Sequence, residues 1–132
     1  MFDSSAEAIA VLTNDHQSEQ ERENAIGFLK NNPDDAGIRA LVTVLHDADT
    51  GVRWSASVAL AELGNASLRP LLAELTSTRN DVNVRQGALH AFHYNADASV
   101  RERTAELQRS LKGPGAASAS MDAAVALMRQ LL

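Results

Sequence analysis

The sequence lacks cysteine altogether, so its 132 residues offer no thiol for a disulfide, for thiolate catalysis or for a cysteine-bound metal. Aromatic residues make up only 4% of the chain. This favours closely packed helices over a sheet, because strands are enriched in aromatic and β-branched residues. No apolar run approaches the ~20 residues that cross a bilayer, and the start, Met1 to Ser4, does not resemble a secretion signal. We therefore expect a cytoplasmic protein that does not bind membranes.

The composition that is present is typical of a folded globular chain, with 45% apolar and 22% charged residues. The length suits one domain over residues 1–132. The net charge is −5, and residues 1–37 alone carry eight acidic and two basic side chains. This acidic end either attracts a basic partner or forms a solvated cap. Neither part of the chain is basic enough for a phosphate-binding groove, so we expect no nucleic-acid partner.

Two segments of the sequence are near-copies, 32 positions apart. Asp49, Val52 and Arg53 open the first copy, and the second has the same residue types at equivalent positions, Asp81, Val84 and Arg85. The segments that precede them also match, with Leu41, Val42 and Leu45 in one and Leu71, Leu72 and Leu75 in the other. A period in the low thirties indicates stacked helix pairs, each of which needs a neighbour to bury its apolar stripe.

Helical spacing of apolar residues continues along the whole chain, and no stretch alternates as a strand does. Polar caps and breakers predict about eight helices in four pairs. The helices are expected after Ser4 or Ser5, after Ser18, from Pro33, over 52–63, from Ser67, over 82–94, over 97–111 and from Ser120. Residues 113–119 are small and rich in helix breakers, which predicts a loop before the C-terminal helix.

The Asp-x-x-Val-Arg openings resemble the second helix of a HEAT repeat, particularly the short HEAT-like repeats found in phycobilin lyases. The resemblance covers residues 34–95 well. It implies an all-α, right-handed α-solenoid of about four HEAT-like helical hairpins. It also implies that the aspartate and arginine pairs form a structural ladder along the seams between repeats. From the residues alone, each arginine can bond the aspartate four positions before it or reach the next repeat. The ladder residues are Asp49, Arg53, Asp81 and Arg85.

The same opening occurs a third time, from Asp97 to Arg101, but only 16 residues after Arg85. This is half a period. The segment 97–112 is interpreted as the first helix of a fourth pair, with residues 120–132 as its partner. Alternatively, it stacks directly on the preceding pair.

The second helices are expected to share a binding surface. At about 100° per residue, Val52, Ala56 and Leu60 fall on the side of the helix that faces the core, and Trp54 falls on the other side. The resemblance implies that the second helices line the inner wall of a HEAT array. The only tryptophan of the chain would then point outward, and tryptophan is over-represented at binding hot spots. The predicted partner-binding residues are Trp54, Ser57, Val58, Ala61, Gln86, Leu89, His90 and His93, with Glu23, Ile26, Gly27 and Lys30 at the equivalent positions one period earlier.

The sequence gives little support for metal binding, cofactor binding or catalysis. His90 and His93 are three apart and can share a metal, but no third ligand is apparent, so we expect no metal, no cofactor and no catalytic residue. We predict a non-catalytic protein-interaction scaffold. The alternative is an accessory or lyase-like subunit that acts on a tetrapyrrole-carrying protein. The apolar C-terminal helix, with Val125, Met128 and Leu131, either folds back on the stack or forms a homodimer.

Overall fold

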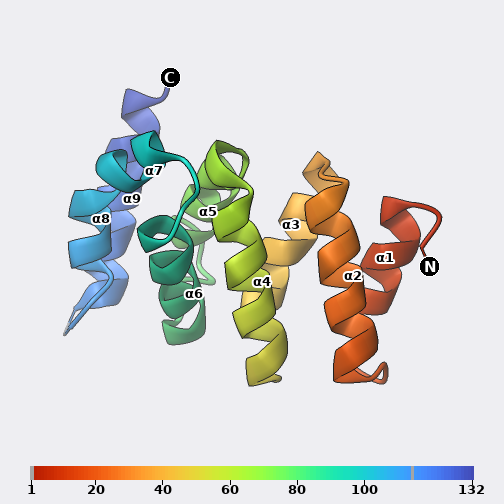
Figure 1. Cartoon of the computed structure of the whole chain (residues 1–132). Helices are drawn as coiled ribbons and strands as arrows, with labels where there is room; N and C mark the ends of the chain where they lie inside the picture. The colour runs from red at the N-terminus through yellow and green to blue at the C-terminus, as the bar shows by residue number, and fades with distance from the viewer. Residues whose placement is uncertain (1, 114) are drawn as a thin grey trace.

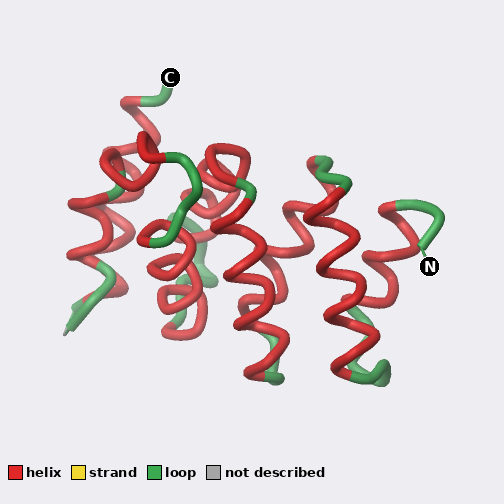
Figure 2. The backbone as a smooth tube through the Cα atoms, viewed as in Figure 1, coloured by secondary structure: helices red, strands yellow, loops and turns green. Residues whose placement is uncertain are grey.

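The computed structural model describes residues 2–113 and 115–132, and within them the chain is helical, without a strand (Figures 1 and 2). The fold is an all-α solenoid, as predicted. A short 3-10 turn at Val44–His46 extends the first helix of one pair, and another at Gly64–Ser67 leads directly into the first helix of the next. The α-helices are α1 (Ser5–Leu12), α2 (Glu19–Asn31), α3 (Asp35–Thr43), α4 (Thr50–Glu62), α5 (Leu68–Leu75), α6 (Val82–His93), α7 (Ala98–Arg103), α8 (Ala105–Ser110) and α9 (Ala116–Gln130).

The helices form two parallel rows (Figure 1). The first-helix row consists of α1, α3, α5 and α9, and each of these helices contacts the next one along the row. The second-helix row consists of α2, α4 and α6, followed by α7 and α8. Contacts between α1 and α2, α3 and α4, α5 and α6, and α8 and α9 join the rows. The apolar core lies between them, as expected for hairpins that bury their stripes against one another.

Local sequence signals set the starts of the helices. The Ser18 hydroxyl accepts a hydrogen bond from the amide of Glu21 at 3.1 Å, and Asp49 and Asp81 cap α4 and α6 in the same way. Such caps satisfy amides that have no partner within the helix. Gly64 stops the extension of α4 with a φ of 64°, a conformation in which glycine avoids the steric cost of a side chain.

Small residues let the second helices approach closely. Ala56, Ala88 and Ala91 are fully buried beside larger residues such as Leu60 and Phe92. At Gly87, an added Cβ would lie 2.7 Å from a methyl group of Leu45. Glycine therefore lets α6 rest directly on the 3-10 turn at Val44–His46, whereas a larger residue would require the Leu45 side chain to shift.

The fourth pair has the reverse order. The interpretation of 97–112 as a first helix is wrong, and the alternative, that this segment stacks directly on the preceding pair, is the arrangement observed. Helices α7 and α8 lie against α6 in the second-helix row, and α9 lies against α5 in the first-helix row. The turn after α6 is tied back to the end of α4, where the amide of Ala96 donates to the Ala61 carbonyl at 2.9 Å and Asn95 donates to the Gly64 carbonyl. This short tether keeps α7 in the row of α6, and the predicted single helix breaks at Thr104.

The predicted loop at 113–119 is shorter in the structure. Helix α9 begins at Ala116, directly after Gly115, whose φ is 75°, and Pro114 lies outside the described residues. Alanine and serine at 116–119 continue the helix because nothing in their side chains breaks it. Ser120 is consequently buried inside α9, where it accepts a hydrogen bond from the Asn80 side-chain amide at 3.1 Å.

The aspartate and arginine residues of the predicted ladder do not pair with one another. Asp49 and Asp81 use their carboxylates as helix caps, with 2.8 Å to the amide of Gly51 and 2.9 Å to that of Val84. Arg53 and Arg85 reach back past these caps to carbonyls of the preceding turn, those of Asp47 at 2.7 Å and Asn80 at 2.9 Å. Arg101 binds the Asn95 carbonyl in the same way. The motif therefore closes a turn and starts a helix, while other residues join the repeats.

The first repeat boundary is joined by Arg22, which is only 4% exposed. Its Nε donates to the Leu12 carbonyl at 2.9 Å, and its Nη1 donates to the Asp47 carboxylate at 3.1 Å. Burial tends to raise the pKa of Asp47, but hydrogen bonds from Arg22 and from the Asp49 amide, with the charges of Arg22 and Arg53, together hold that pKa below its ordinary value. Since Asp47 also supplies the carbonyl for Arg53, one residue connects both hairpins.

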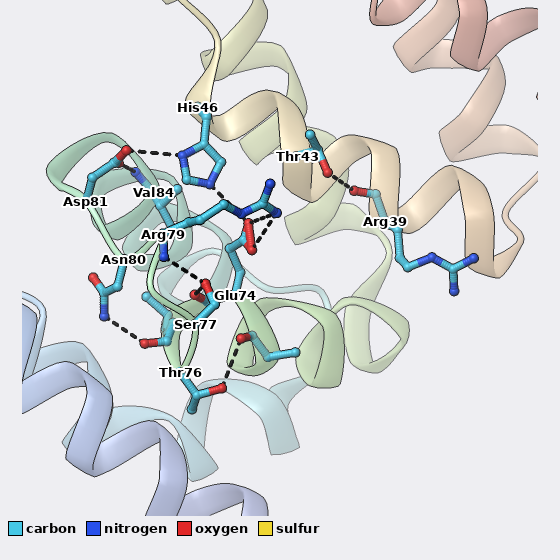
Figure 3. A network of polar contacts seen from close by, with 12 residues as sticks. Arg39, Thr43, His46, Glu74, Thr76, Ser77, Arg79, Asn80, Asp81 and Val84 are labelled. Atoms are coloured by element: carbon cyan, nitrogen blue, oxygen red, sulfur yellow. Dashed lines mark hydrogen bonds and ion pairs between the residues drawn. The ribbon is translucent and has the colours of Figure 1, made fainter.

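The second boundary is joined by His46, which lies between two carboxylates (Figure 3). Its Nδ1 is 3.1 Å from Asp81 and its Nε2 is 3.0 Å from Glu74, and Arg79 binds Glu74 at 2.8 Å. Burial tends to raise the pKa of Asp81, but the Val84 amide and His46 hold it below its ordinary value. The network thus connects the end of α3 with α5 and with the start of α6.

We predict that Arg22→Met destabilises the protein by about 2–4 kcal/mol, because it leaves Asp47 without its counter-ion at a largely buried site. Urea unfolding followed by circular dichroism measures this. The folded-state pKa of Asp47 is lowered, so its contribution is present above the unfolded pKa and is lost as the pH falls through the folded one. The difference in unfolding free energy between the wild type and Arg22→Met should therefore narrow below about pH 4. Arg109→Met, in an exposed ion pair, is the control and should cost less than about 1 kcal/mol.

Candidate partner-binding surface

The second-helix face, formed by α2, α4 and α6, places most of the predicted residues at the surface. Trp54 is 59% exposed, and Gln86 and His93 are also exposed. Val58, Leu89 and His90 are partly buried and line the surface between the helices.

Ser57, Ala61 and Ile26 were predicted on this surface, but the structure buries all three. They are only 2%, 4% and 4% exposed, respectively. The Ser57 hydroxyl donates to the Trp54 carbonyl at 2.8 Å within the same helix. The prediction assigned a single buried side to α4, but a helix in the middle of a row is also covered along its flanks by α2 and α6.

An aromatic row crosses the second-helix face from α4 to the end of α6. The ring centroids of Trp54 and His90 are 4.5 Å apart, those of His90 and Tyr94 are 4.8 Å apart, and those of Tyr94 and His93 are 4.7 Å apart. Contacts of this kind stabilise the relative positions of the rings. The row therefore presents a pre-organised apolar strip to solvent.

Tyr94 is part of this row, although sequence reasoning did not assign it to the site. It is 65% exposed and is the C-terminal cap residue of α6. The sequence did contain a signal that places Tyr94 beside His90. Tyr94 follows His90 by four positions, and residues at this spacing share one face of a helix.

Shallow hollows lie on both sides of Trp54. The hollow between α4 and α6 has a volume of about 180 Å³, and its lining includes Gln86, Gly87 and His90. The hollow between α2 and α4 has a volume of about 270 Å³, and its lining includes Ile26 and Val58. The indole borders both hollows, so a partner that covers Trp54 can place side chains on either side of it.

The charged groups beside Trp54 already have partners within the chain. Lys30 forms an ion pair with Glu62 at 2.8 Å, and the Ser55 hydroxyl donates to Glu23 at 2.7 Å. A partner is therefore not needed to neutralise Lys30 or Glu62, and the Glu23 carboxylate already has a hydrogen-bond donor within the chain. The apolar rings carry the free binding capacity of this face.

His90 is held largely as the neutral imidazole. Partial burial lowers its pKa, and the nearby His93 adds to this effect by charge repulsion. No group of three or more His, Asp or Glu side chains within residues 2–113 and 115–132 is arranged to hold a metal ion. The geometry around His90 is that of a stacked ring in an aromatic contact surface.

Comparison with protein families identifies the class of the protein. The profile described as HEAT repeats matches residues 5–93. This is more than half of the chain, which therefore belongs to the HEAT-repeat family. The match ends at the last residue of α6, so it spans the three regular hairpins and stops before the reversed pair. Comparison with curated proteins and with solved structures gives no match.

The finer resemblance to the repeats of phycobilin lyases stays a prediction.

In the part of the chain that the structure describes, none of the helices has the length and apolar character needed to cross a membrane.

We predict that His90 titrates below the ordinary value of 6.5, which NMR can follow through its ring protons. His93→Gln removes the neighbouring charge and should raise the pKa of His90. Because the pKa of His90 is lowered in the folded state, the stability that His90 contributes is lost as the pH falls. The unfolding free energy of the wild type should therefore decrease more between pH 7 and 5 than that of His90→Gln. An unchanged His90 titration in His93→Gln would contradict the contribution of His93 and leave burial as the cause of the lowered pKa.

Proposed function

We propose that the protein is a non-catalytic interaction scaffold that binds a protein partner on its second-helix face. The aromatic row is the observation that carries this proposal. Trp54, His90 and Tyr94 are held against one another before any partner arrives, so little conformational entropy is lost when they are covered. The cytoplasmic location expected from the sequence is part of the proposal.

The partner is expected to contact Trp54 as an anchor and to extend across α2, α4 and α6. Exposed tryptophan and tyrosine side chains dominate the energetics of many interfaces, since they bury large apolar areas while keeping a polar tip. Partner side chains would occupy the hollows beside the indole, and polar residues such as Asn83 and Gln86 would form the rim.

A pigment-related role is the weaker candidate. The hollows beside Trp54 measure about 180 and 270 Å³, below the range of about 300–1,000 Å³ usual for drug-sized ligands. Their small size and shallow form favour the side chains of a protein over a tetrapyrrole.

We predict that Trp54→Ala weakens partner binding by about 30-fold or more, as for a hot-spot residue. A photo-crosslinking amino acid at Gln86 captures the partner, and titration of the purified partner against each variant measures the affinity. Val82→Ala is the matched control, because Val82 is 56% exposed but lies at the start of α6 and lines neither hollow. It should bind like the wild type.

Equal loss of affinity in both variants would contradict the proposed surface. The intrinsic fluorescence of Trp54 gives a second readout, because it is the only tryptophan in the chain. A bilin that changes this fluorescence at micromolar concentration, where no protein partner does so, would favour the pigment-related role instead.

A homodimer through the C-terminal helix is a separate prediction. Val125 and Met128 are only partly buried, and Leu132 is fully exposed. Sedimentation velocity over a range of concentrations tests it. A monomer at all concentrations would contradict it, whereas a dimer dissociated by Val125→Asp would support it.

A further inference from the structure

We propose that a second binding site lies on the opposite, first-helix row and that it takes an acidic amphipathic helix of a partner protein. The site is a groove that runs across α3, α5 and α9, and we call it the arginine groove. Its rim carries Arg39, Arg69, Arg79 and Arg129. The proposal does not depend on the function proposed for the second-helix face, because the two faces share none of these residues.

The groove is continuous because its two hollows have common walls. The larger hollow, of about 460 Å³, lies between α3 and α5, and the smaller, of about 280 Å³, lies between α5 and α9. Arg69 and Met128 line both. The combined groove therefore spans three helices of the first-helix row.

The floor of the groove is apolar. Ile38 and Val42 contribute from α3, Pro70 and Ala73 from α5, and Met128 from α9. Ile38 and Val42 lie four positions apart and so share one face of α3. An apolar floor between charged edges fits a ligand that is itself amphipathic.

The positive charge of the rim is only partly neutralised. Arg39 and Arg129 make no side-chain hydrogen bond or ion pair with residues 2–113 and 115–132, and Figure 3 shows Arg39 extending away from the polar network around His46. Arg69 donates to the neutral carbonyl of Leu131 at 2.8 Å. Only Arg79 has an acidic partner, Glu74, which His46 also contacts.

Among the residues that the structure describes, Asp35 is the only other acidic side chain that lines the groove. The groove therefore carries excess positive charge on a protein whose net charge is −5. Carboxylates are the expected ligands, because guanidinium groups bind them through paired hydrogen bonds. An anionic partner would also be guided to this face in preference to the acidic first 37 residues.

A helix is the form of ligand that the surroundings favour. Within the first-helix row, α9 already packs along α5, so the row accepts helices from outside the regular hairpins. Grooves between helices receive the side-chain ridges of another helix, whose apolar residues recur every three or four positions. Acidic residues along the edges of that stripe would meet the rim arginines.

The test uses a synthetic peptide of about 18 residues, roughly 27 Å long as a helix, with leucine on one face and glutamate on the other. A peptide with lysine in place of glutamate is the first control. Fluorescence anisotropy measures binding to the full chain, and NMR chemical shifts locate it. We expect the glutamate peptide to bind at least about tenfold tighter than the lysine peptide, and less tightly as salt is added.

The double variant Arg39→Glu with Arg69→Glu should lose at least about tenfold in affinity. The matched control, Arg103→Glu with Lys112→Glu, makes the same change in net charge at exposed residues outside the groove. It should lose less than about threefold. Circular dichroism melts establish that both variants are folded, and Trp54→Ala should bind the glutamate peptide like the wild type.

Four results would overturn the proposal. Equal binding of the two peptides, or equal losses in the two double variants, would show that the groove does not select acidic helices. Shifts confined to α4 and α6 would place the peptide on the other face. Self-association without peptide that the groove variant abolishes would identify a second copy of this chain as the occupant.

Discussion

A single helical hairpin of this length cannot bury its own apolar stripe, so each pair is stable only against its neighbours. The polar contacts at the two repeat boundaries follow from this dependence. Arg22 reaches from the first hairpin to Asp47, and His46 reaches from the second to Glu74 and Asp81. Because Arg22, Asp47 and Glu74 lie largely out of solvent, separating two hairpins would leave charges without partners as well as apolar surface exposed.

The stacking also explains why the molecule has two dissimilar faces. Side chains of successive second helices share one face, which contains the tilted, contacting rings of Trp54, His90 and Tyr94. On the first-helix row, arginines from distant parts of the chain surround an apolar floor. Under the two proposals, the aromatic face and the cationic face would bind two partners of different chemistry.

Features determined within one turn of helix were predictable from the sequence. Asp49 and Asp81 cap their helices through amides only two or three residues away, and the exposure of Trp54 follows from its angle on α4. Burial of Ser57 and Ala61 was missed because it depends on the flanks of neighbouring helices. The arginine groove was missed because Arg39, Arg69 and Arg129 are far apart in sequence and meet only when α9 folds onto α5.

The order of the last two elements was also mispredicted, because the Asp-x-x-Val-Arg motif does not encode a place within a hairpin. In all three occurrences the aspartate caps the helix start and the arginine binds a carbonyl of the preceding turn. These capping and turn contacts lie within about two turns of the chain, whereas the contact of Asp81 with His46 and the burial of Val52, Val84 and Val100 depend on neighbouring elements.

Each of these aspartate–arginine units therefore starts a helix through contacts to its own turn, whichever row that helix joins. Successive units lie 32 and then 16 positions apart. Their spacing is consequently no measure of how many hairpins an array contains.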